Sequence, residues 1–264
     1  MGVLPTYWKP YDESLPGNSR VDQVLTWLDL PAVDRPNLLT VYFEDTDTAG
    51  HERGPDSDAV RDAIRRVDGY LGRLLRGLDR RGLTSRVNII VVSDHGMTGV
   101  DTDRTIVLDD YIALSDVDIA DINPTVGLFP KAGKEAGVYD ALVNAHPHLK
   151  VYRRSETPEE WHYREHKRIP PIVGVADEGW QVLRRSTVQD IASGKNRGAR
   201  GQHGYDPALP SMHGIFVAAG PAFKAGKTVP AFQNVHIYEA LAAILGVPPA
   251  LNDGDPSVAR SLLR

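Results

Sequence analysis

Three separate segments of the sequence carry carboxylate and imidazole side chains that could share a metal ion. The five candidate ligands are Asp47, His51, Asp94, His95 and His203. Carboxylate oxygens and imidazole nitrogens are both ligands of zinc. Five are too many for one catalytic zinc, which keeps a coordination position open, and about right for two metals with one ligand missing. Two metals about 3.5–4 Å apart are the usual clamp for in-line phosphoryl displacement.

The other histidines are better interpreted as ordinary surface or core residues. They are His146, His148, His162, His166, His213 and His236. His146 and His148 also form an H-x-H pair. That pair falls in an irregular part of the sequence, so we interpret it as incidental.

The elements that must position the ligands follow from the pattern of apolar residues. Two apolar, β-branched runs at 38–43 and 87–92 predict buried strands, and each ends where candidate ligands begin. Between them, an apolar stripe predicts one long amphipathic helix, with Asp56 or Ser57 as its N-cap and Gly82 at its end. A strand–helix–strand order predicts a parallel sheet with a right-handed crossover. Ligands then gather at the carboxyl ends of the strands.

The remaining segments complete an α/β pattern. Helices are predicted from Asn18 to Pro31 and over 235–245, an apolar strand at 214–219, and a surface position for the tail beyond 245. Residues 104–200 are less regular. They predict strands at 105–108, 125–129 and 148–153, a helix at 138–145, a helix capped by Thr157, and a hairpin of 172–176 with 180–183. We interpret this stretch as a small α+β insert within a single domain spanning 1–264.

Composition bounds the classes of function. A chain of 264 residues with 41% hydrophobic content can bury a sizeable core. A net charge of −5 gives no reason to expect binding to a nucleic-acid polymer, and no apolar run is long enough to span a membrane. The absence of cysteine excludes disulfides and thiolate metal sites. The N-terminal residues do not have the pattern of a secretory signal.

Taken together, the motifs resemble those of one known family. The segments are Glu44–Pro55, Ser93–Met97, His203–Asp206 with Met212, and Gly220–Phe223, and the stretch Tyr11–Leu30 resembles what precedes the first motif. The pattern is similar to that of the nucleotide pyrophosphatase/phosphodiesterase family of the alkaline phosphatase superfamily. The resemblance implies a doubly wound, mainly parallel α/β sheet. It also implies two zinc ions that hydrolyse nucleotide phosphodiester and pyrophosphate bonds.

The resemblance assigns roles to individual residues. Asp47, His51 and His203 resemble the ligands of one zinc ion, and Asp94 and His95 resemble two ligands of the other. Tyr11 falls where the family places an aromatic residue that stacks on the nucleobase. Tyr42 is a second candidate for the same pocket, with an ordinary core tyrosine as the alternative.

The sequence also departs from the family pattern. No Lys-Thr-Phe-Pro-like nucleophile motif and no further Asp ligand of the second zinc precede Tyr11. We therefore expect a C-terminal portion of such an enzyme, N-terminally truncated, with an incomplete sheet and weak or no activity alone. The resemblance implies a periplasmic or secreted protein and a small nucleotide or other phosphodiester substrate. The alternatives are another phosphohydrolase or mutase of the superfamily, and a non-catalytic metal- or nucleotide-binding module.

Overall fold

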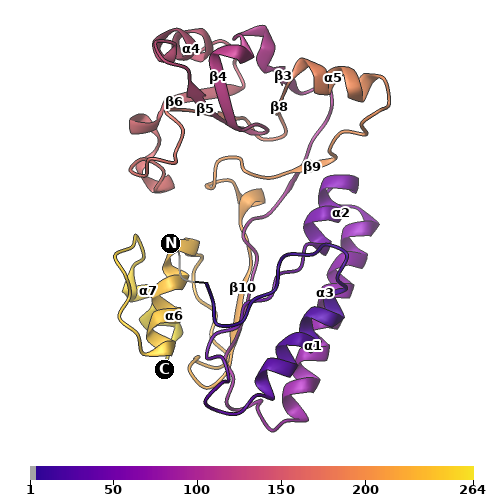
Figure 1. The fold of residues 1–264 in the computed structure, drawn as a ribbon, viewed down its shortest axis with the longest axis vertical. Coiled ribbons are helices and arrows are strands. Elements are labelled where there is room, and N and C mark those ends of the chain that lie inside the picture. The colour runs from indigo at the N-terminus through magenta and orange to yellow at the C-terminus, as the bar shows by residue number, and fades with distance from the viewer. Residues whose placement is uncertain (1–3) are drawn as a thin grey trace. The chain divides into compact units, whose positions relative to one another are not determined.

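The structure is a computed structural model that describes residues 4–264 (Figure 1). The chain forms two compact units. The first consists of the residues up to Asp47 together with Arg61–Val92 and Phe216–Arg264. The second consists of Thr48–Val60 and Ser93–Ile215.

The first unit is built on two long helices that pack side by side. They are α1 (Gly17–Leu28) and α3 (Asp58–Asp79), of which the residues from Arg61 belong to this unit. The helices approach closely at two glycines: a Cβ on Gly17 would meet the Tyr70 ring at 2.3 Å, and one on Gly77 would meet Leu25 at 2.5 Å. Side chains larger than glycine at these points would push the helices apart.

Two strands and two C-terminal helices complete the first unit. The strands β1 (Ile89–Val92) and β10 (Phe216–Ala219) pair antiparallel, and α6 (Ile237–Leu245) lies against α7 (Pro256–Leu262). Ala259 and Leu262 of α7 are buried with Ala240 and Phe223. The expectation of a surface tail beyond 245 is therefore wrong, because α7 contributes apolar side chains to a core.

The second unit contains a four-stranded antiparallel sheet in the order β4–β5–β7–β6. Its strands are Val117–Asp121, Thr125–Pro130, Ile172–Ala176 and Leu149–Arg153 in that order. A core that includes Leu108, Leu128, Leu142, Ile172 and Val182 packs around it. The helices of this unit are α4 (Glu135–Leu142), α5 (Arg185–Ala192) and most of α2 (Asp45–Arg53).

Two small strand pairs and several short helical turns fill the rest. β3 (Thr105–Val107) pairs parallel with β8 (Gln181–Leu183), and β2 (Thr98–Gly99) pairs antiparallel with β9 (Gly201–Gln202). The 3-10 turns are Leu108–Asp110, Leu114–Asp116, Arg154–Glu156, Glu159–Trp161, Pro210–Met212 and Asn234–His236.

Four of the predicted helices are confirmed, as α1, α3, α4 and α6, and the long one, α3, has Ser57 at its N-cap. The Ser57 hydroxyl accepts a hydrogen bond from the Val60 amide at 3.3 Å. At the other end Gly82 has a φ of +62°, and the Leu83 amide donates to the Leu78 carbonyl at 2.9 Å. A left-handed residue just past the last turn is the usual way in which a helix ends.

The α/β fold class is confirmed, but the described residues form four small sheets, of which only the β3–β8 pair is parallel. The prediction of a strand at 38–43 is wrong, because no strand is assigned there. A strand needs a neighbour to complete its hydrogen-bond ladder. In residues 4–264, β1 pairs with β10 alone, and the Tyr42 carbonyl accepts from the Arg20 side chain at 2.8 Å.

Two expectations inside 104–200 are corrected. The strands β7 and β8 exist, but they do not form a hairpin, because β7 pairs with β5 and β6 and β8 pairs with β3. Thr157 is fully buried and does not cap a helix. Its hydroxyl lies 3.0 Å from the Arg154 carbonyl and 2.8 Å from that of Tyr163, so it ties together an irregular segment. Over the part of the chain that the structure describes, no helix has both the length and the apolar character to cross a membrane.

Candidate metal centre

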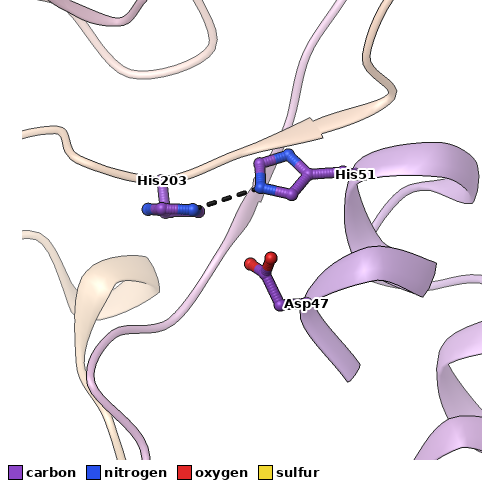
Figure 2. Close-up of side chains that lie close together, drawn as sticks. All are labelled: Asp47, His51 and His203. Carbon is purple, nitrogen blue, oxygen red and sulfur yellow. Dashed lines mark hydrogen bonds between the residues drawn. The ribbon is translucent and has the colours of Figure 1, made fainter. Parts of the chain in front are cut away.

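Asp47, His51 and His203 converge on one point (Figure 2). Each residue offers one ligand atom, and these three atoms all lie within 4.8 Å of one another. All three side chains are half-buried. Ligands about 2.0–2.2 Å from a common zinc ion would be separated by distances of this order. Within residues 4–264 this is the one group of three or more acidic, histidine or cysteine side chains with such a geometry.

The helix α2 sets the relative positions of Asp47 and His51. The two residues are four positions apart, so their side chains project from the same face of the helix. The helix ends where the Gly54 amide donates to the Gly50 carbonyl at 2.8 Å, and Gly54 has a φ of +86°. The Arg200 amide donates to the His51 carbonyl at 2.7 Å, which joins this end of α2 to the segment that leads to His203.

The backbone at Gly201 orients the His51 ring. Nδ1 of His51 lies 2.8 Å from the Gly201 carbonyl oxygen. Because a carbonyl only accepts, Nδ1 carries the proton, and the lone pair of the ring is on Nε2. That Nε2 lies 3.1 Å from Nε2 of His203. A hydrogen bond from the far nitrogen to a carbonyl is the usual arrangement of a metal-ligating histidine.

The close approach at Gly201 depends on the absence of side chains. A Cβ on Gly201 would lie 2.5 Å from the Gly50 carbonyl oxygen and 2.8 Å from Sδ of Met97. A Cβ on Gly50 would lie 2.3 Å from the same sulfur. Glycine at both positions therefore allows β9 to pass directly over α2.

The residues after His203 are held by hydrogen bonds to the rest of the second unit. Thr125 donates from its hydroxyl to the Gly204 carbonyl at 2.6 Å, and the Tyr205 hydroxyl donates to the Trp180 carbonyl at 2.9 Å. Burial raises the pKa of Tyr205, so its hydroxyl stays protonated and remains a donor. These two hydrogen bonds hold the segment that directly follows His203 in place.

The second predicted pair, Asp94 and His95, lies beside the trio without joining it. The His95 ring stacks on the His203 ring, with centroids 3.5 Å apart and planes 12° apart. Nε2 of His95 is 3.6 Å from Oδ1 of Asp94, whose side chain is 69% exposed. Nδ1 of His95 lies 2.9 Å from the Gly96 carbonyl, which again leaves the lone pair on Nε2.

The two aromatic residues predicted to bind substrate lie against each other in the first unit. Tyr11 and Tyr42 meet edge to face with ring centroids 6.1 Å apart, and they are 64% and 52% exposed. Both side chains are thus exposed at the surface. The alternative that Tyr42 is an ordinary core residue is wrong.

The sequence did not reveal two features that the structure places next to these residues. One is the Gly201 carbonyl, a backbone group that leaves no signature in residue type. The other is Arg20, which forms an ion pair with Glu44. Arg20 lies on the polar face of a predicted helix, where an arginine is normally interpreted as solvated.

Comparison with known proteins identifies the family. The family described as "Type I phosphodiesterase / nucleotide pyrophosphatase" matches residues 2–206. Human ectonucleotide pyrophosphatase/phosphodiesterase family member 5 is 38% identical over 251 residues, which cover 95% of this chain and 50% of the human protein. The bis(5'-adenosyl)-triphosphatase enpp4 of Xenopus laevis is 35% identical over 262 residues, covering 99% of this chain and 56% of that protein. The chain spans about half the length of these relatives.

Solved structures agree with the sequence relatives. Murine ectonucleotide pyrophosphatase/phosphodiesterase 5 superposes with a TM-score of 0.89 at 40% identity, over 99% of this chain and 68% of the murine chain. A second structure, of an inactive variant of the same murine protein in complex with AMP, gives the same TM-score. A family match over most of the chain, relatives above 30% identity and a shared fold lead to one conclusion. The chain belongs to the type I phosphodiesterase/nucleotide pyrophosphatase family.

Proposed function

We propose that this chain carries the metal- and nucleotide-binding part of a zinc-dependent hydrolase of nucleotide phosphodiester and pyrophosphate bonds. The observation that carries the proposal is the convergence of Asp47, His51 and His203 within 4.8 Å of one another. Two residues of the trio lie on one helix and the third is 152 positions away from His51. Such a convergence from distant segments is what a metal site requires.

The donor set fits zinc. One carboxylate and two imidazoles are a ligand set of catalytic zinc sites, which keep a position open for substrate or water. The bond from Nδ1 of His51 to the Gly201 carbonyl presents Nε2 for ligation. A zinc ion held there supplies Lewis-acid chemistry to a phosphoryl oxygen.

Asp94 and His95 are proposed as two ligands of a second zinc ion. Their support is position: His95 stacks directly on His203, so a second metal held by them would lie next to the first. With two ligands from the described residues, this second site is partial.

The proposed substrate is a small nucleotide. The exposed rings of Tyr11 and Tyr42 provide surfaces on which a base can stack. Two comparisons support this choice: the murine structure is a complex with AMP, and the Xenopus relative is named as a bis(5'-adenosyl)-triphosphatase. The net charge of −5 does not favour a nucleic-acid polymer.

We also propose a sheet type for the family fold and a location for the protein. The doubly wound, mainly parallel sheet of the alkaline phosphatase type is proposed for the family fold from the resemblance of the motifs, and the TM-score of 0.89 supports a fold shared with the murine protein. A periplasmic or secreted location is proposed from the family resemblance, and the prefix "ecto" in the relatives' names supports it.

One assay series tests the proposed function. Purified, zinc-loaded chain is offered a nitrophenyl ester of a nucleotide and nitrophenyl phosphate, with zinc content measured by atomic emission. We expect bound zinc and turnover of the diester that is slow beside the roughly 10 per second of a typical enzyme. Preference for the monoester would assign the chain to another branch of the superfamily. Zinc binding with no turnover of either ester would favour a binding module.

A further inference from the structure

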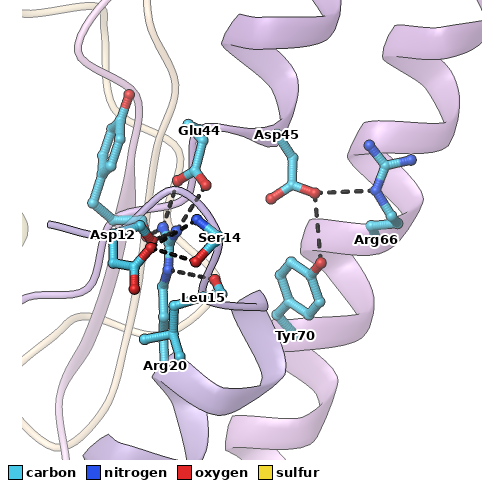
Figure 3. Close-up of polar contacts among 9 residues, drawn as sticks. Asp12, Ser14, Leu15, Arg20, Glu44, Asp45, Arg66 and Tyr70 are labelled. Carbon is cyan, nitrogen blue, oxygen red and sulfur yellow. Dashed lines mark hydrogen bonds and ion pairs between the residues drawn. The ribbon is translucent and has the colours of Figure 1, made fainter.

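Arg20 of α1 lies at the centre of a polar network that joins three segments of the first unit (Figure 3). Its guanidinium forms a two-pronged ion pair with Glu44: Nη2 donates to Oε1 at 2.7 Å and Nη1 donates to Oε2. The side chains are only 12% and 17% exposed. A largely buried, bidentate pair of this kind is held much more rigidly than a surface ion pair.

The same guanidinium also holds three backbone carbonyls. Nη1 donates to Tyr42 at 2.8 Å, Nη2 to Asp12 at 3.0 Å, and Nε to Leu15 at 3.2 Å. With the two bonds to Glu44, these use all five N–H donors of an arginine. No donor remains for a phosphate oxygen. The donor count therefore favours a structural task over anion binding.

The segments that Arg20 ties together are those that carry the two exposed tyrosines. Tyr11 precedes Asp12, and the Arg20 guanidinium carbon lies 5.6 Å from the centroid of the Tyr11 ring. Tyr42 is held through its own carbonyl. Residues 8–12 and 38–44 have neither helix nor strand hydrogen bonding to fix them. The Arg20 contacts therefore help to fix the relative position of the two rings.

The network continues to the start of α2. Glu44 directly precedes this helix, and the next residue, Asp45, accepts from Nε of Arg66 at 3.0 Å and from the Tyr70 hydroxyl at 3.5 Å. Arg20 therefore anchors the Tyr42–Glu44 segment, while Arg66 and Tyr70 of α3 anchor Asp45, the residue that follows it.

We propose that Arg20 is a positioning residue for base recognition, which holds Tyr11 and Tyr42 as a preformed aromatic pair. This inference rests on the proposed function, because it takes the ligand to be a nucleotide. Lysine cannot replace arginine here. It has three donors on one nitrogen and no planar fork to reach Glu44 and three carbonyls together.

The test compares two ligands that differ by the base. AMP and ribose 5-phosphate are titrated into the zinc-loaded full chain by calorimetry, for the wild type, Arg20→Lys and the control Arg73→Lys. Arg73 forms a similar fork with Asp22, at 2.6 and 2.9 Å, but that pair is about half exposed and lies between α1 and α3. Base stacking contributes enough affinity that we expect Arg20→Lys to bind AMP about tenfold more weakly. Its affinity for ribose 5-phosphate and its zinc content should not change.

Each outcome decides between the inference and the function on which it rests. If the wild type prefers AMP and Arg20→Lys keeps that preference, Arg20 does not position the rings. An equal loss for both ligands would also overturn the inference, since a merely structural defect has no reason to spare ribose 5-phosphate. If the wild type itself shows no preference for AMP, the nucleotide proposal fails. Should Arg20→Lys not fold, Glu44→Gln keeps the arginine but removes the charge that holds its guanidinium in place, and it decides by the same ratio.

Discussion

Nε2 of His51 and Nε2 of His203 lie 3.1 Å apart, although the two residues are 152 positions apart in the chain. The Gly201 carbonyl fixes the proton of His51 on Nδ1, so the lone pair of its Nε2 faces the other ring. Two lone pairs at this distance repel unless a proton or a cation lies between them. A zinc ion held by both nitrogens would lie between these two lone pairs.

The first prediction is that His203→Ala lowers zinc affinity by far more than His213→Ala. Removing one ligand of three should lower the zinc affinity by more than the roughly 10–100-fold that follows from mutating residues that only support the ligands. His213 is a suitable control, because it is exposed and follows the short turn at Pro210–Met212. Zinc retained after dialysis, measured by atomic emission, checks the prediction. Equal zinc content in both variants would refute the role of His203.

The second prediction concerns the glycine whose carbonyl orients His51. A Cβ at Gly201 would lie 2.5 Å from the Gly50 carbonyl, so Gly201→Ala should destabilise the zinc-free chain by about 1–3 kcal/mol, as overpacking does. It should also weaken zinc binding, because the Gly201 carbonyl would move away from His51. Urea unfolding and a zinc titration measure the two effects.

The control for that substitution is its partner in the β2–β9 pair. Gly99 lies opposite Gly201, and a Cβ there would meet nothing within 4 Å. Gly99→Ala should therefore change stability by no more than about 0.5 kcal/mol, the usual effect of a surface substitution. Indistinguishable urea midpoints for the two variants would show that the contact at Gly201 can relax.

The third prediction is one tightly bound zinc ion per chain. Within residues 4–264 only the trio of Asp47, His51 and His203 offers three ligand atoms close together. Asp94 and His95 offer two, so a metal there should exchange readily. Asp94→Asn should leave the tight zinc in place, because the exposed Asp94 side chain lies outside the trio. If Asp94→Asn loses the tightly bound zinc ion on equilibrium dialysis, the two metal sites do not bind independently.

The candidate site was largely predictable from the sequence because its ligands follow a local rule. Asp47 and His51 are four positions apart in the sequence and lie on the helix α2, and this spacing allows a shared metal. His203 was identified by residue type and by the apolar strand that follows its loop. The orientation of His51 was not predictable, because it comes from the backbone carbonyl of Gly201.

The misses in the fold share one physical cause, which is that pairing is not local. The residues of 38–43 have strand propensity, yet a strand exists only where another strand hydrogen-bonds to it. The same holds for β7 and β8, which are adjacent in sequence but pair with other strands. Thr157 illustrates a second limit. A threonine hydroxyl can cap a helix, but it can equally form hydrogen bonds to buried backbone carbonyls. In the folded chain it does the latter, with the carbonyls of Arg154 and Tyr163.

The last prediction concerns the pH dependence of stability through Glu44. Hydrogen bonds from the Arg20 guanidinium hold the pKa of Glu44 below its ordinary value of 4.5. The pKa of Glu44 is lower in the folded chain than in the unfolded chain. The ionised carboxylate therefore makes its full contribution to the free energy of unfolding above pH 4.5, and this contribution is lost as the pH falls through the folded pKa. Glu44→Gln should be less stable than the wild type at pH 7, by about 1–3 kcal/mol for a lost bond to a charged group. The difference should shrink as the pH falls below 4.5.

Urea unfolding of zinc-free protein between pH 7 and pH 3 measures that difference directly. Other carboxylates with lowered pKa values titrate in the same range, but they do so in both proteins and cancel; they are Asp12, Asp22, Asp29 and Asp255. Asp22→Asn is the matched control, because its fork with Arg73 is about half exposed and is screened by solvent. The Asp22→Asn effect at pH 7 should be clearly smaller. A constant difference between wild type and Glu44→Gln at every pH would mean that the Arg20–Glu44 pair contributes through packing and not through charge.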